Sequence, residues 1–430
     1  MSKRNISRRS VLKGTAAAAG VAVGSGAVSG FPTIWAQNLK DITLRSMGSA
    51  VTHVEPWAKQ ASEDLGFKVE ITALDFDSIT NRIITQPGSF DIAEPAFNYF
   101  RRLSAGAKLQ PIDTKRLKNW DQFNDLYRTG KLTPSAPFGD GQNPTTVMYT
   151  NDSGKSFVKP GQSDQILGLP SVHNADTLGY RPDLTGRKLD SWAELISDEW
   201  RGKVGLQSFP DIAMMDIALA IEGAGLLKYG NKGNMTKDEI DKTFVILSDL
   251  KKKGHVRAFW TTFSESVTLM VSGETVIQSM WSPAVTVAKS QGVPAVYGDL
   301  KEGYRGWTIG YVMPETLKGL KLDAAYEFFD WLSSGWSGAF FSRQGYYMPT
   351  LDATKKFMSA DEWGFWYEGK PAQGVIKDPF GNALEQPGSV RDGGSYQSRM
   401  GNIAVWNSEF DEFGYLVDEW NKFQSGDRKS

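Results

Sequence analysis

Short runs of β-favouring residues alternate with segments of helical periodicity along much of the chain, and this alternation restricts the possible folds more than any other feature. Residues 42–46, 67–71 and 90–94 are strand candidates, while apolar residues recur at helical spacing in 51–65 and 79–84. Such alternation is typical of α/β layers in which helices cover a largely parallel sheet. The sequence therefore predicts an α/β fold.

The same alternation continues in the second half of the chain after one interruption. Residues 133–165 are rich in proline and glycine and lack a helical period, which predicts a long surface loop. Ser191, with Glu194 three residues later, matches a capping box. Further along, 202–206 is a strand candidate and 240–251 has the pattern of an amphipathic helix.

Length and composition indicate an ordinary globular protein of two domains. The chain has 430 residues, more than one hydrophobic core usually supports. Its 48 Lys and Arg residues nearly balance 49 Asp and Glu residues, so no strong field attracts nucleic acid or an anionic membrane. The absence of cysteine excludes disulfides, thiol nucleophiles and Cys-ligated zinc. We therefore expect no nucleic-acid partner, no metal and no cofactor.

The first 36 residues have the pattern of a bacterial twin-arginine export signal. The twin arginine of SRRSVLKG precedes a weakly apolar stretch, 15–29, which is too short and mild to span a bilayer. Ile34 and Ala36 stand three places and one place before a cleavage point after Ala36. The pattern predicts a periplasmic protein, and a membrane anchor that is never cut is the alternative.

The sequence offers no recognisable catalytic motif. Its three histidines, His53, His173 and His255, have no metal-ligand spacing, and no phosphate loop, GxSxG elbow or HExxH motif occurs. A periplasmic α/β hydrolase is the alternative from another class, because a pair of catalytic carboxylates leaves no clear motif. The adjacent Tyr346 and Tyr347 could bind ferric iron, but no histidine or acid stands at a spacing that would complete such a site. A binding protein is favoured over an enzyme.

Polar and aromatic residues recur where a predicted strand ends. In open α/β sheets the carboxyl ends of the strands line the ligand crevice, because exposed backbone and helix N-termini gather there. Two such sheets facing each other would form an aromatic-lined cleft between two lobes. The candidate residues are Ser46, Glu94, Asp211, Trp281, Ser282 and Trp307.

Six segments of the chain form a succession in a fixed order. They are PGSFDIAEP (87–95), SWAELISDEWRGKVGL (191–206), VSGETVIQSMWSPAV (271–285), KEGYRGWTIGYVMP (301–314), AAYEFFDWL (324–332) and GYYMPT (345–350). Each segment alone is weak, but their succession covers nearly all of the mature chain. Together they make the chain resemble a periplasmic solute-binding protein of an ABC importer, of the spermidine/putrescine-binding family.

The resemblance implies a type II periplasmic binding protein, with two α/β lobes joined by hinge strands around a ligand cleft. Carried over, lobe one comprises 39–171 plus 283–322, and lobe two comprises 172–282 plus 323–425. The chain would cross between lobes near LGLPSVHNADTLGY (167–180) and near Pro283. The lobes would close on a small molecule and deliver it, as a monomer, to a permease in the inner membrane.

The resemblance also implies which residues contact the ligand. Trp281 occupies the position of a family tryptophan that packs against the ligand, and a tryptophan face attracts an organic cation by roughly 0.5–2 kcal/mol. Trp307 and Trp260 are the next aromatic candidates, although core packing is an equal alternative for Trp260. A diamine also needs carboxylates at its ends, and the candidates by position are Glu94, Asp211 and Glu302.

Two departures from the family pattern place spermidine itself in doubt. Thr308-Ile309 stand where polyamine binders usually carry an aspartate, and Ser46-Met47-Gly48 replace an aromatic–acid pair. A smaller amine, a quaternary ammonium compound or an amino-acid derivative would fit the aromatic residues equally well. If Arg45 faces the cleft, it could bind a carboxylate of the ligand. Solvation of Arg45, or its pairing with a nearby acid, is the favoured alternative.

Overall fold

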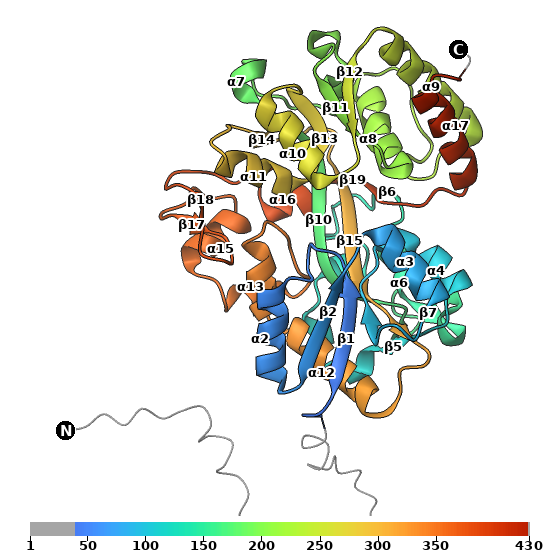
Figure 1. Cartoon of the computed structure of the whole chain (residues 1–430), viewed down its shortest axis with the longest axis vertical. Helices are drawn as coiled ribbons and strands as arrows, with labels where there is room; N and C mark the ends of the chain where they lie inside the picture. Colours follow the sequence, from blue (N-terminus) through green and yellow to red (C-terminus); the bar gives the residue numbers. More distant parts are fainter. Residues whose placement is uncertain (1–38, 429–430) are drawn as a thin grey trace, which may run out of the picture. The chain divides into compact units, whose positions relative to one another are not determined.

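The computed structural model of the chain describes residues 39–428, and two sheets covered by helices form their framework (Figure 1). The predicted export signal lies outside the described residues. Among residues 39–428, no helix has the length and apolar character needed to cross a membrane.

The smaller sheet contains three parallel strands in the order β2-β1-β3. Helix α2 (Glu55–Leu65) connects β1 (Thr43–Gly48) to β2 (Lys68–Ala73), and α3 (Phe76–Thr85) leads to β3 (Ile92–Ala93). The apolar stripe of α2 is buried, and the helix ends at a glycine in the left-handed conformation, which glycine adopts without strain. The three predicted strands and two predicted helices are thus confirmed within a few residues.

The larger sheet has eight strands in the order β12-β11-β13-β10-β15-β19-β6, with β14 also paired to β10. Strand β11 runs parallel to β12 and β13, whereas β10 runs antiparallel to β13, β14 and β15. Its strands are β6 (Asp140–Gly141), β10 (Leu169–Tyr180), β11 (Val204–Gln207), β12 (Val256–Trp260), β13 (Ile277–Met280), β14 (Val296–Tyr297), β15 (Tyr304–Tyr311) and β19 (Ile403–Trp406).

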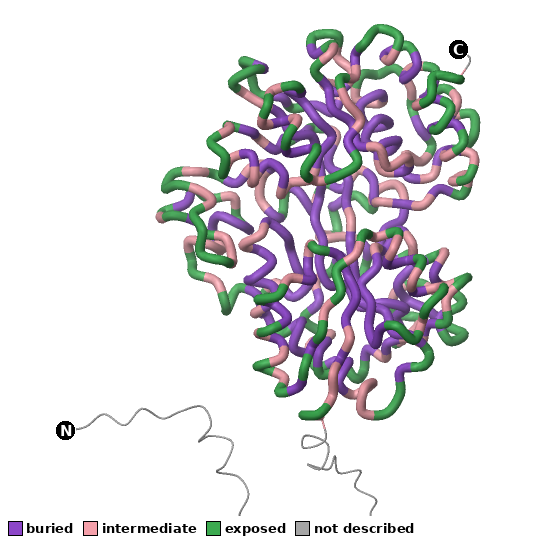
Figure 2. The backbone as a smooth tube through the Cα atoms, viewed as in Figure 1, coloured by how far each residue is buried: buried purple, intermediate pink, exposed green. Residues whose placement is uncertain are grey.

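Strand β10 joins two groups of strands. Its first part, Leu169–Asp176, pairs with β15, and its last four residues pair with β13. All twelve of its residues are buried (Figure 2). Val172 and Ala175 belong to one hydrophobic cluster, and Leu178 belongs to another. The contribution of β10 to both clusters supports the passage of the chain between lobes at 167–180, which stays a prediction.

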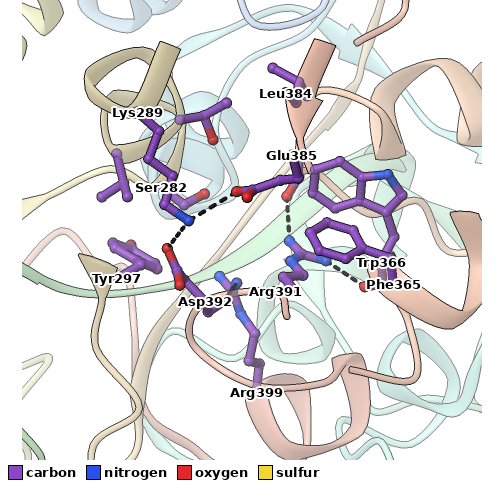
Figure 3. Close-up of a pocket in the computed structure, with 13 residues that line it drawn as sticks. Ser282, Lys289, Tyr297, Phe365, Trp366, Leu384, Glu385, Arg391, Asp392 and Arg399 are labelled. Atoms are coloured by element: carbon purple, nitrogen blue, oxygen red, sulfur yellow. Dashed lines mark hydrogen bonds and ion pairs between the residues drawn. The ribbon is translucent and has the colours of Figure 1, made fainter. Parts of the chain in front are cut away.

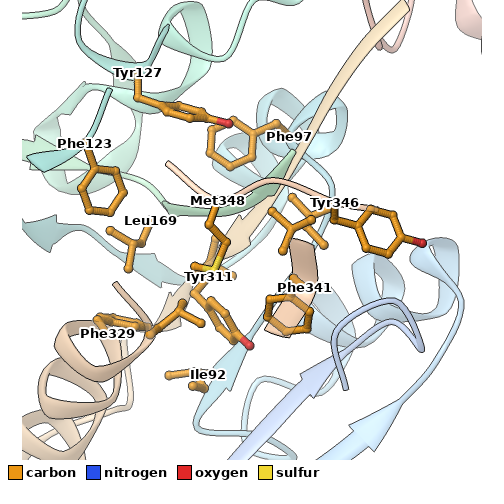
Figure 4. Packing of buried hydrophobic residues seen from close by; sticks show 14 of the residues in the cluster. Ile92, Phe97, Phe123, Tyr127, Leu169, Tyr311, Phe329, Phe341, Tyr346 and Met348 are labelled. Atoms are coloured by element: carbon orange, nitrogen blue, oxygen red, sulfur yellow. The ribbon is translucent and has the colours of Figure 1, made fainter. Parts of the chain in front are cut away.

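Three clusters of buried apolar residues support the two-lobe architecture. The first surrounds the small sheet and includes residues of β10, β15, α12 (Gly319–Leu332) and α13 (Trp336–Ser342), as Figure 4 illustrates around Tyr311 and Phe329. The second and third lie around the β11 end of the large sheet. Their helices are α8 (Pro210–Gly223), α9 (Lys237–Lys252), α10 (Phe263–Ser272), α11 (Ser282–Ser290) and α17 (Phe413–Ser425). The predicted two-lobe α/β fold is confirmed.

The same clusters bear on where one lobe ends and the other begins. Apolar residues of 324–372 pack with the first cluster, and those of 284–297 pack with Trp260 and Met280 in the third. Exact lobe boundaries stay a prediction, but this packing favours placing 323–372 in lobe one and 283–297 in lobe two, unlike the boundaries that the resemblance implies.

Two local predictions need correction. Ser191 caps the short helix η6 (Trp192–Ile196) by accepting from the Ala193 N–H. The Glu194 carboxylate, however, accepts from Arg187 and Trp200, so the reciprocal half of the capping box is missing. Residues 133–165 are not one surface loop, since they contain short helices and strands. Val147 and Met148 within them are fully buried, which polar composition alone does not reveal.

Shorter elements complete the described part. They are α4 (Phe100–Gly106), α5 (Asp125–Arg128), α6 (Thr145–Met148), α7 (Pro182–Thr185), α14 (Leu351–Lys355), α15 (Ala360–Trp366), α16 (Tyr396–Met400), β4 (Leu109–Gln110), β5 (Ile112–Asp113), β7 (Thr150–Asn151), β8 (Ser156–Phe157), β9 (Gln165–Ile166), β16 (Met313–Pro314), β17 (Ile376–Lys377) and β18 (Ala383–Glu385), with 3₁₀ turns η2 (Phe97–Tyr99), η3 (Thr114–Arg116), η4 (Trp120–Gln122), η5 (Asp152–Gly154), η6 (Trp192–Ile196) and η7 (Asp198–Trp200).

Candidate functional site

Three aromatic side chains meet at the carboxyl ends of β11, β12 and β13. The Trp281 ring stacks on Phe209 with centroids 6.1 Å apart and planes 18° apart, and it meets Trp260 edge-on at 5.2 Å. Trp260 is 1 % exposed and donates its Nε1–H to the Ser279 carbonyl, so core packing accounts for it. Trp281 and Phe209 stay partly exposed.

The position of Trp281 follows from the local sequence. Strand β13 ends at Met280, and Trp281 is the extended residue that precedes α11. Pro283 stands in the first turn of α11, where a proline has no backbone N–H to lose and favours the helical φ. The Ser282 hydroxyl accepts from the Asn174 side chain of β10 at 3.2 Å. The transition from strand to helix therefore holds Trp281 and Ser282 at the carboxyl end of β13.

Asp211 lies in the first turn of α8, two residues after Phe209. Its carboxylate accepts from the Ile212 N–H at 2.9 Å. Burial raises the pKa of Asp211 to about 6, and the negative charges of Asp77 on α3 and Glu409 act in the same direction. Carboxylates from separate elements therefore lie near one another here, an arrangement that a bound cation would stabilise.

Tyr99 belongs to the same acidic neighbourhood. Burial raises the pKa of its phenol, and Asp211 and Asp77 raise it further. Asp77 is exposed on α3, and no sequence pattern marks it as a site residue. Only the fold brings it close to the start of α8.

Trp307 lies on β15 directly opposite Asn174 of β10. It is partly exposed, and its ring meets Tyr346 edge-on with centroids 5.9 Å apart. Since Asn174 also bonds to Ser282, the structure brings Trp307 and Ser282 to the same stretch of β10.

Glu94 and Ser46 lie together in an internal polar network. Each is 1 % exposed. The Glu94 carboxyl accepts from the hydroxyls of Thr52 and Ser171 and lies 3.5 Å from Nδ1 of His53, whose Nε2 bonds to the Ser46 hydroxyl at 2.8 Å. Burial raises the pKa of Glu94 to about 7 and lowers that of His53 to about 3. Both side chains thus already have hydrogen-bond partners within the protein, and a ligand contact for either Glu94 or Ser46 stays a prediction.

Glu302 and Arg45 also have protein partners. The Glu302 carboxylate accepts from the Ser191 hydroxyl and, at 3.0 Å, from the Trp192 N–H. It lies beside Gly223, at the opposite end of α8 from Asp211, so the structure does not bring these two carboxylates together. Arg45 forms a two-point ion pair with Asp91, in agreement with the favoured prediction that it is solvated or paired with an acid.

A small cavity opens beside Ser282 and is visible in Figure 3. It has about 40 Å³ of free volume. Arg391, Arg399 and Lys289 supply positive charge, and Glu385 and Asp392 supply negative charge. The remaining lining is mostly apolar or aromatic and includes Val285, Tyr297, Phe365, Trp366 and Leu384.

Sequence reasoning missed both arginines of this cavity. They lie in GSVRDGGSYQSRM (388–400), a turn-rich segment without periodicity that gives no sign of burial. Only the fold shows that both arginines are buried, because residues of α11, α15 and β18 enclose them. Tyr347, considered above for iron, is fully buried against Tyr396 and Tyr367. Within residues 39–428, no group of three or more His, Asp or Glu is arranged to hold a metal ion.

Solved structures with the same fold include several binding proteins. The spermidine/putrescine ABC transporter substrate-binding protein PotD from Streptococcus pneumoniae is 15 % identical with a TM-score of 0.61, and the alignment covers 90 % of this chain and 99 % of that one. The Tp0655 lipoprotein of Treponema pallidum is 10 % identical with a TM-score of 0.59 and the same coverage. MotA from A. tumefaciens, in complex with glucopine, is 13 % identical, with a TM-score of 0.56 and coverage of 89 % and 99 %.

A family model places the chain more directly than these distant folds. The model of bacterial extracellular solute-binding proteins matches residues 57–363, well over half of the chain. This match confirms the predicted class, a solute receptor rather than an enzyme, and it agrees with export from the cytoplasm. The chain therefore belongs to the family of bacterial extracellular solute-binding proteins.

Proposed function

We propose that this protein is the receptor of an ABC importer and captures a small amine-containing solute between its lobes. After twin-arginine export it would work in the periplasm as a monomer and present the closed, loaded form to a membrane permease. The fold it shares with spermidine/putrescine-binding proteins supports the transporter role.

One observation carries the choice of an amine. The partly exposed Trp281 stacks on Phe209, and Asp211 follows Phe209 by two residues in a neighbourhood shared with Asp77 and Glu409. An aromatic face and carboxylates are the two groups that stabilise a desolvated ammonium, through cation–π attraction and charge-assisted hydrogen bonds. The departures at Thr308 and Ser46 favour an amine other than spermidine.

Closure would depend on the strands that join the lobes. Strand β10 contributes to two hydrophobic clusters and pairs with β15 over most of its length. Rotation of the lobes about β10 and β15 would bring Asp77, on α3, toward Asp211, on α8. A ligand that contacts both sides would favour the closed population, which is all that transport requires of the receptor.

We expect one amine of a defined panel to raise the unfolding temperature of the mature protein by several degrees. A ligand at 100 times its dissociation constant adds about 2.7 kcal/mol to the free energy of unfolding. The panel comprises putrescine, spermidine, choline, betaine, basic amino acids and, as a control, ferric citrate, and the measurement is thermal unfolding monitored by intrinsic fluorescence.

The substitution Trp281→Ala should abolish that shift, because it removes the exposed aromatic face. Trp120→Ala is the matched control, since Trp120 is also partly exposed and packs edge-on or tilted against Phe123 and Tyr149 away from the carboxyl end of β13. A shift retained in Trp281→Ala would remove Trp281 from the site. No shift with any amine would leave the receptor class intact and refute the amine ligand.

A further inference from the structure

The cavity beside Ser282 carries an imbalance of buried charge. Lys289 already pairs with both acids of the lining, with its Nζ 2.9 Å from Glu385 and 2.7 Å from Asp392. Three cationic and two anionic side chains therefore leave one net positive charge. The two remaining cations, Arg391 and Arg399, are 7 % and 1 % exposed.

The hydrogen bonds of the two arginines go to neutral oxygens. Arg399 donates to the Asn174 side chain at 2.9 Å and to the Ala175 carbonyl, while its Nε–H has no partner among the described residues. Arg391 donates to the carbonyls of Gly345, at 2.7 Å, and Trp366. In the described part of the chain, neither guanidinium forms an ion pair with a carboxylate within 4.0 Å.

Apart from these oxygens, only aromatic rings offset the two buried charges: Arg391 lies over Tyr347 and Trp366, and Arg399 lies over Tyr297. A buried charge is retained only when a counter-charge or several hydrogen bonds offset its desolvation. Burial lowers the pKa of Arg391 to about 10, and the positive charge of Arg399 contributes in the same direction. A single negative charge placed between the guanidiniums would offset both the desolvation and their mutual repulsion.

Size and lining restrict what that anion can be. A cavity needs about 10–15 Å³ to hold one water molecule, so about 40 Å³ admits only a group of a few heavy atoms. The Ser282 hydroxyl adds a further donor. Ser282 also begins α11, whose N-terminal end favours negative charge. A carboxylate has the matching size, charge and acceptor geometry.

We infer that the cavity formed by Arg391, Arg399 and Ser282 is a carboxylate-binding site. Ser282 follows Trp281 directly, so this site adjoins the aromatic surface proposed for the amine. The inference therefore deepens the proposed function, on which it rests for the amine end: the solute carries both a carboxylate and an amine. A separate small carboxylate would use the same chemistry.

The test measures thermal unfolding of the whole mature protein with sodium acetate, 4-aminobutyrate and putrescine, each against sodium chloride at equal ionic strength. Stabilisation by 4-aminobutyrate or acetate, with affinity reduced about tenfold or more in Arg399→Gln and Arg391→Lys, supports the site. The second variant keeps the charge but loses the forked donor geometry. Arg257→Gln, an exposed arginine, is the matched control and should bind as wild type does.

The probes separate the two sources of the carboxylate. Binding of acetate alone identifies a free small anion, and binding of 4-aminobutyrate alone identifies a carboxylate that belongs to the amine solute. If neither compound stabilises the protein beyond sodium chloride, or if both variants bind as tightly as wild type, the carboxylate site is refuted. A shift with putrescine in that case leaves the proposed amine function standing.

If either variant fails to fold, crystals of the wild-type protein still test the carboxylate site. Crystals soaked in bromoacetate should show bromine anomalous density next to the cavity, with the carboxylate between Arg391 and Arg399. Density elsewhere only, or none, contradicts the inference.

Discussion

Replacing Arg305 by methionine should lower the free energy of unfolding by about 3–5 kcal/mol, the usual cost of removing one partner of a buried ion pair. Arg305 is 1 % exposed on β15. Its Nε lies 2.7 Å from Asp216 on α8, and its Nη2 lies 3.4 Å from Asp176 on β10. The substitution would leave two buried carboxylates without their cation.

The position of this triad explains why the effect should be large. Asp176 and Arg305 face each other across the β10–β15 pair, and Asp216 connects that pair to α8. Burial already raises the pKa of Asp176 although the charge of Arg305 opposes it. Without Arg305 the buried carboxylate of Asp176 would have to remain charged without its cation or take up a proton.

Urea unfolding of wild type and variant at pH 7.5 measures the loss. Arg257→Met is the control, because the exposed Arg257–Glu274 pair should contribute less than about 1 kcal/mol. Adding Asp176→Asn and Asp216→Asn to Arg305→Met should recover much of the stability, since no buried charge is then left unpaired. Equal losses for Arg305→Met and Arg257→Met would contradict the assignment.

Sequence patterns predict those parts of this fold that depend on local periodicity. The strand and helix succession around β1, α2 and β2 follows from alternating apolar patterns, and Pro283 after Trp281 marks the start of α11. The two-lobe class follows from the order of motifs along the chain. These features involve residues close in sequence, where spacing alone determines which side chains share a face.

Contacts between distant segments account for what the sequence did not reveal. The like charges of Asp77 and Asp211 lie well over a hundred residues apart in the sequence, and Arg399 reaches Asn174 from 225 residues away. No periodicity links such positions. Glu302 is a case of the same kind: the sequence does not show that its carboxylate accepts from Ser191 and the Trp192 N–H, and its contact with a ligand stays a prediction.

The substitution Glu94→Gln should make the protein more stable than wild type by about 3 kcal/mol at pH 8 and by little at pH 4. Burial raises the pKa of Glu94 from 4.5 to about 7 in the folded protein. The neutral carboxyl therefore favours folding fully below pH 4.5, and this contribution is lost as the pH rises to about 7, since each unit of pKa shift corresponds to about 1.4 kcal/mol. Glutamine keeps the neutral shape at every pH.

Comparison of the two proteins isolates Glu94 from the other buried groups. His53, whose pKa is lowered to about 3, destabilises both proteins as the pH falls below 6.5, so its contribution largely cancels in the difference. Urea midpoints at half-unit steps from pH 4 to 8.5 should show a difference in stability that grows between pH 4.5 and 7.

Glu70→Gln is the control: Lys68 lowers the pKa of the exposed Glu70, so the small effect of this substitution on stability should have the opposite sign. A difference between Glu94→Gln and wild type that does not change with pH would mean that the pKa of Glu94 is the same in the folded and unfolded protein, so that its carboxyl is ionised in the folded protein at neutral pH. The hydroxyls of Thr52 and Ser171, the latter on β10, would then stabilise a negative charge beside the strand that joins the lobes.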